Sequence, residues 1–130
     1  MDNKLVYTLT TDRPFDTVIE TIEKLVPEHK FRVLAKHDVR ATLAEKGLQR
    51  GPLNIIEVCN ASFAHEALKK DELVSLFMPC RITVYVKGDK TVVNLARPSM
   101  IAEMMPGAGL EKLAGEVEIT LKKIVEDAVK

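Results

Sequence analysis

The chain has 130 residues, a length that predicts one domain covering residues 1–130. Nineteen basic and nineteen acidic residues cancel, and the six aromatic residues include no Trp. The composition therefore excludes the basic surface and the aromatic stacking platforms typical of nucleic-acid binding. No apolar run is as long as a signal peptide or a membrane span, so we expect a cytoplasmic protein with no membrane partner. In a reducing compartment, two cysteines are expected to be free thiols.

The first half of the chain alternates between strand and helix patterns. Apolar residues at every second position predict strands, whereas apolar residues three or four apart predict helices. Asp12 and Asp38 are the expected N-caps of two helices, the first ended by Pro27 and the second by Gly47. The predicted elements are a strand at 4–10, a helix with an apolar stripe at 15–26, a strand at 31–37, a short helix at 38–47 and a strand at 55–60.

The second half begins with a helix that Ser62 or Asn60 could cap and that Pro79 breaks. Two strands joined by a tight turn follow it, and an irregular segment with two prolines and two glycines leads to a long C-terminal helix. The predicted elements are a helix at 62–77, strands at 80–86 and 91–97, an irregular segment at 98–109 and a helix from about 109 to the C-terminus.

The element order is β-α-β-α-β-α-β-β-α, which predicts an α+β fold with a mainly antiparallel sheet covered on one face by helices. The strand at 80–86 places Cys80, Ile82, Val84 and Val86 on one face and polar residues on the other. We therefore expect a sheet with one buried face and one partly wet face. The wet face is a candidate surface for self-association.

Cys59 and Cys80 are the two candidates for thiol chemistry. Cys59 ends a strand just before a helix, where the helix dipole would lower the pKa of a thiol, so Cys59 is the candidate catalytic nucleophile. Cys80 shares the apolar face of its strand, which predicts a buried, inert thiol. The simpler alternative is that both cysteines are small apolar residues of the core.

His65 lies a little more than one helical turn after Cys59. With Cys59 and Cys80 it would form a Cys-His-Cys set suited to zinc or copper, and it could also serve as a base toward Cys59. A solvated helix histidine is the simpler interpretation of His65. Asn60 is a helix cap by position, and together with Cys59 and Cys80 it makes up the predicted ligand-binding set.

Three methionines fall in the irregular segment before the last helix. Met100, Met104 and Met105 would suit Cu(I) beside a cysteine, but flexible gap-filling or a lid over an apolar pocket is the favoured interpretation. The sequence identifies no cofactor.

Three short patterns resemble those of the DUF302 family, small bacterial and archaeal proteins of unknown function. They are "D....L..KG" from Asp38, "CN...A..AL" from Cys59 and "PCRITVYV" from Pro79. The resemblance covers nearly the whole chain and implies a compact α+β fold, often a homodimer, with no assigned activity. This chain departs from the family pattern at Ala61, where Pro is common, and at Met78, where Leu is common.

Three functions are compatible with these observations. The first is a non-enzymatic module that binds a small molecule or a metal near Cys59 and Cys80, probed by metal content and ligand binding. The second is a thiol-dependent redox or transfer enzyme with Cys59 as the reactive thiolate, Cys80 as its resolving partner and His65 as a base. The third is a structural or interaction domain without a site.

Overall fold

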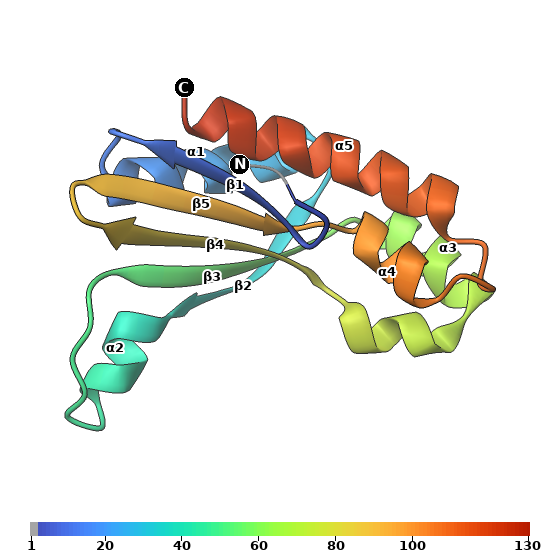
Figure 1. The fold of residues 1–130 in the computed structure, drawn as a ribbon, viewed down its shortest axis with the longest axis horizontal. Coiled ribbons are helices and arrows are strands. Elements are labelled where there is room, and N and C mark those ends of the chain that lie inside the picture. Colours follow the sequence, from blue (N-terminus) through green and yellow to red (C-terminus); the bar gives the residue numbers. More distant parts are fainter. Residues whose placement is uncertain (1–2) are drawn as a thin grey trace.

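A five-stranded antiparallel sheet forms the centre of the fold (Figure 1), with the strand order β1-β5-β4-β3-β2. The computed structural model of the chain describes residues 3–130. The strands are β1 (Val6–Thr11), β2 (Arg32–Asp38), β3 (Leu53–Cys59), β4 (Cys80–Lys87) and β5 (Lys90–Ala96). Gly88, with φ of +64°, makes the tight turn between β4 and β5, as the glycine at this turn predicted.

Most of the helices gather on one face and at one end of the sheet, whereas the short helix that follows β2 lies at the opposite end (Figure 1). Two long helices, α1 (Phe15–Glu28) and α5 (Glu111–Ala128), pack against each other and against the strands. The shorter helices are α2 (Val39–Ala44), α3 (Ala61–Lys70), the 3-10 helix η1 (Glu72–Phe77) and α4 (Ser99–Met104). None of the helices within residues 3–130 is long and apolar enough to cross a membrane.

The α+β fold and the predicted element order are confirmed, with two local differences. The helix predicted over 62–77 is divided at Asp71, where the backbone is extended and the carboxylate accepts a hydrogen bond from the Leu73 N–H at 2.9 Å. This bond caps η1 as a separate turn. The segment predicted to be irregular contains α4, a helix too short for its pattern to stand out.

The boundaries of α1 also differ from prediction. Pro14, rather than Asp12, is the N-cap residue, and Asp12 instead forms an ion pair with Lys90 on β5. Pro27 does not end α1 but lies within its last turn, and the helix ends one residue later at Glu28. The chain leaves the helix at Lys30, which has a φ of +65°.

The predicted alternation in β4 is confirmed by its burial. Ile82 and Val84 are fully buried beneath the helices, whereas Arg81 is exposed on the opposite face. The buried sides of β3, β4 and β5 meet α1 and α5 in the main core, whose fully enclosed members include Ile22, Ile56, Ile82, Leu95, Leu121 and Ile124.

A smaller apolar cluster lies at the end of the sheet where α3, η1 and α4 gather (Figure 1). Its buried members are Val74, Ala102, Leu110 and Ala114. The side chains between this small cluster and the main core line a cavity.

Candidate functional site

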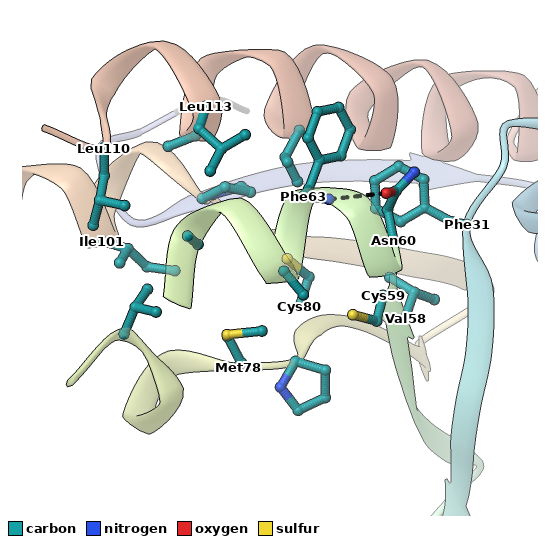
Figure 2. Close-up of a pocket in the computed structure, with 17 residues that line it drawn as sticks. Phe31, Val58, Cys59, Asn60, Phe63, Met78, Cys80, Ile101, Leu110 and Leu113 are labelled. Carbon is teal, nitrogen blue, oxygen red and sulfur yellow. Dashed lines mark hydrogen bonds between the residues drawn. The ribbon is translucent and has the colours of Figure 1, made fainter. Parts of the chain in front are cut away.

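The cavity has a volume of about 80 Å³ and is lined almost wholly by apolar groups (Figure 2). Its walls come from Phe31 before β2, the end of β3, the start of β4, α3, η1, α4 and the first turns of α5, together with the residues that flank these helices. The lining residues are Phe31, Val58, Cys59, Asn60, Phe63, Ala64, Ala67, Val74, Met78, Pro79, Cys80, Pro98, Ile101, Leu110, Leu113, Ala114 and Val117. The volume is several times the 10–15 Å³ that one water molecule needs.

Strand pairing brings the two cysteines to the same cavity. Cys80 opens β4 opposite Val58 of β3, so Cys59 is only one residue beyond the pair. Both side chains line the cavity beneath α3 in the view of Figure 2, and both thiols are free. The sequence identified both residues, but their proximity depends on the register between β3 and β4.

Burial raises the pKa of both thiols. Burial, together with the neighbouring Cys59 thiol, raises the pKa of Cys80 to about 11, and Arg81 offsets this only in part. Burial likewise raises the pKa of Cys59, so the prediction of a lowered value is wrong. The free Phe63 N–H at the start of α3 donates to the Asn60 side chain rather than to a sulfur, so it does not offset the effect of burial.

Asn60 is the one residue with a polar side chain on the cavity wall, and its amide is already engaged. Its Oδ1 accepts from the Phe63 N–H at 3.1 Å and caps α3, while its Nδ2 donates to the Lys30 carbonyl at 3.0 Å. The amide therefore ties the start of α3 to the loop that precedes β2. Of the two caps that the sequence allowed, Asn60 fills the position and Ser62 does not.

Replacing Asn60 with Ala is expected to lower the free energy of unfolding by about 1–2 kcal/mol, because both hydrogen bonds are lost. Ser62→Ala provides the matched control, since Ser62 is exposed and caps nothing in the described chain, and it should change stability by less than about 0.5 kcal/mol. Urea unfolding followed by circular dichroism measures both. Equal losses in the two variants would contradict the capping role of Asn60.

His65 lies outside the cavity. It is exposed on α3, whereas Phe63, Ala64 and Ala67 of the same helix line the wall. The proposed Cys59, His65 and Cys80 set is therefore not brought together, and residues 3–130 contain no cluster of three or more metal-binding His, Cys, Asp or Glu side chains. Of the ligand-binding set, Cys59, Asn60 and Cys80 do share one cavity.

Sequence reasoning missed most of the apolar wall. Met78, Phe31 and Ile101 line the cavity, although no pattern in the sequence indicates that they meet. Of the methionines in the segment before α5, Met105 packs on the small cluster and Met104 is exposed. The available signal was the apolar face of α3, where Phe63, Ala64 and Ala67 recur at helical spacing.

Comparison with known proteins agrees with this fold. Residues 7–128 match the family described as "Domain of unknown function DUF302". The crystal structure of an uncharacterized conserved DUF302 protein from Bacillus stearothermophilus has a TM-score of 0.90 and 30% sequence identity to this chain, and the match covers 98% of this chain and 100% of that one. No curated protein sequence matches. The chain therefore belongs to the DUF302 family.

Proposed function

We propose that the protein is a non-enzymatic binding module for a small apolar molecule, held in the cavity that Cys59 and Cys80 line. The observation that carries this proposal is the wall itself, which is apolar except for the Asn60 amide. Because that amide is already bonded to Phe63 and Lys30, it is not free to anchor a polar ligand. A ligand would bind through shape and apolar contact, as in other apolar protein cavities.

The protonated thiols support the same conclusion. With a pKa of about 11, Cys80 would be ionised in roughly one molecule in ten thousand at pH 7. A protonated thiol behaves as a small apolar group, so both cysteines extend the apolar wall. Metal binding by these two thiols would require both to lose a proton in a setting that opposes ionisation.

Xenon is the probe that tests the proposal, because it is neutral, smaller than benzene and known to enter apolar cavities. Titration of the native protein, followed by ¹H–¹³C methyl spectra, should give saturable shifts at Leu113 and Ile101. Ala67→Leu adds a side chain to the wall and should abolish these shifts, whereas Ala61→Leu, at an exposed position on the same helix, should leave them unchanged. If neither the wild type nor Ala61→Leu shows saturable shifts, the proposal is refuted and an interaction domain without a site is favoured.

The alternative is a thiol-dependent redox or transfer enzyme using Cys59, which predicts that Cys59 reacts fast at pH 7. The raised thiol pKa values predict the opposite. Reaction of the native protein with iodoacetamide should be slow at pH 7 and should increase as the pH rises above 9. Cys59→Ser and Cys80→Ser assign the rates, with Cys80 expected to remain unreactive to about pH 11. A fast reaction at pH 7 that Cys59→Ser removes would favour the enzyme.

We also propose that the partner is a second copy of this chain, bound through the sheet face turned away from α1 and α5. Tyr85 and Ile55 lie half-buried on this face, and Thr8, Asn94 and Thr83 form a hydrogen-bonded row across it. Arg81 and Glu57 form an ion pair on this face, with 3.4 Å between Arg81 Nε and Glu57 Oε2. A twofold axis would offer each of these charges its opposite on the other copy.

Light scattering coupled to size-exclusion chromatography tests the homodimer. Tyr85→Asp places a charge in the proposed interface and should convert a dimer into a monomer. Lys24→Asp, at an exposed position on α1, is the matched control and should leave the mass unchanged. A monomeric mass for the wild-type chain at micromolar concentration would refute this part of the proposal.

A further inference from the structure

A second hollow, a groove of about 540 Å³, lies between α1 and the segment formed by β2 and α2, near the end of β3 opposite Cys59. One wall carries acidic groups from α1, namely Asp16, Glu20 and Glu23. The other wall carries the basic groups of Lys36 on β2 and Arg40 on α2, with the Asp38 carboxylate between them in the sequence. The groove therefore presents acidic groups on the α1 side and both signs of charge on the other side.

Asn54 of β3 lines this groove and is only 7% exposed. Across residues 3–130, its side-chain amide makes no hydrogen bond. Every fully enclosed side-chain nitrogen or oxygen in the described chain has a hydrogen-bond partner. The Asn54 amide must therefore keep contact with open space, and the open space beside it is the groove. The amide therefore faces the groove with its donor and acceptor open to a partner from outside the chain.

Some of the charges around the groove are already engaged. Glu23 and Lys36 form an ion pair at 3.3 Å, and Asp38 caps α2 by accepting from the Ala41 N–H. Asp16 and Glu20 on one wall, and Arg40 on the other, have no ion pair within the described chain. One turn of α1 separates the two free carboxylates, so both lie on the same helix face.

We propose that this groove binds a small zwitterion of the α-amino acid class. The ammonium group would lie against Asp16 and Glu20, and the carboxylate would lie against the Arg40 guanidinium. The Asn54 amide can both donate and accept, so it suits either end of the ligand. Phe15, Ile19 and Pro52 supply an apolar wall for a side chain. The volume lies in the range of small-molecule sites.

L-Leucine is the probe, and two analogues that each lack one charge dissect its binding. 3-Methylbutylamine lacks the carboxylate and 4-methylpentanoate lacks the ammonium group. Titration followed by ¹H–¹⁵N spectra should show saturable binding of L-leucine at the groove, with at least tenfold weaker binding of each analogue. No saturable binding of L-leucine, or equal binding of leucine and either analogue, would overturn the proposal.

Variants locate the site and separate binding from folding. Asn54→Leu should abolish leucine binding while raising Tm or leaving it unchanged, because the substitution removes an unpaired amide from a nearly buried position. Glu20→Gln and Arg40→Gln should each weaken binding at least fivefold. Glu116→Gln, at an exposed position on α5, is the matched control and should bind leucine as wild type does. Unchanged binding in folded Asn54→Leu and Arg40→Gln would overturn the assignment.

Discussion

Replacing Glu118 with Ala is expected to destabilise the fold by about 3–5 kcal/mol, the range for removing one partner of a buried ion pair. Glu118 is only 8% exposed on α5, and its carboxylate accepts hydrogen bonds from Arg97 at 3.0 and 3.1 Å and from the Ser99 N–H at 3.0 Å. The carboxylate thus holds the end of β5 and the start of α4 against α5. Without it, the mostly buried Arg97 guanidinium loses the carboxylate with which it pairs at 3.0 Å.

The contribution of Glu118 should depend on pH. Burial alone would raise the pKa of this carboxyl, but the hydrogen bonds from Ser99 and Arg97 outweigh burial and lower the pKa from 4.5 to about 2. Because the folded pKa is the lower one, the stabilisation is fully present above about pH 4.5 and is lost as the pH falls from 4.5 to 2. A shift of this size corresponds to about 3 kcal/mol.

Urea unfolding of wild type and Glu118→Gln between pH 2 and pH 7 measures this dependence. The stability difference between the two should shrink toward zero as the pH approaches 2. Glu116→Ala, at an exposed position on the same helix, controls for the loss of a carboxylate and should change stability by less than about 0.5 kcal/mol. A difference that is constant across this pH range would contradict the assigned role of Glu118.

Replacing Leu121 with Ala is expected to lower the free energy of unfolding by about 3–4 kcal/mol, because Leu121 is fully enclosed in the main core. The loss combines the transfer of the side chain from the core with the cavity left behind. Ile119→Ala on the same helix is the matched control. Ile119 is 72% exposed, so its truncation should cost less than about 1 kcal/mol. Denaturant unfolding measures both losses. Similar losses for the two variants would contradict the assignment of Leu121 to the buried face of α5 and of Ile119 to its exposed face.

Local patterns in the sequence determined most of the architecture. Alternation in β4 and the apolar stripes of α1 and α5 are properties of neighbouring residues, so the element order and the single buried sheet face could be predicted from them. The cap of α2 by Asp38 was also predictable, because the bond reaches only three residues along the chain to the Ala41 N–H. The six-residue helix α4 has the length of α2 but no side-chain cap that marks its start, so it could not be predicted in the same way.

The sites depend on contacts that only the tertiary structure decides. Cys59 and Cys80 share a cavity because β3 and β4 pair in one register. The walls that bury them raise both pKa values, including that of Cys59, which its helix position alone would lower. Asn54 lies in a hydrophobic strand, and only the packing of α1 beside β2 and α2 reveals that its amide lines a charged groove. Burial and desolvation come from residues distant in sequence, so no local pattern determines them.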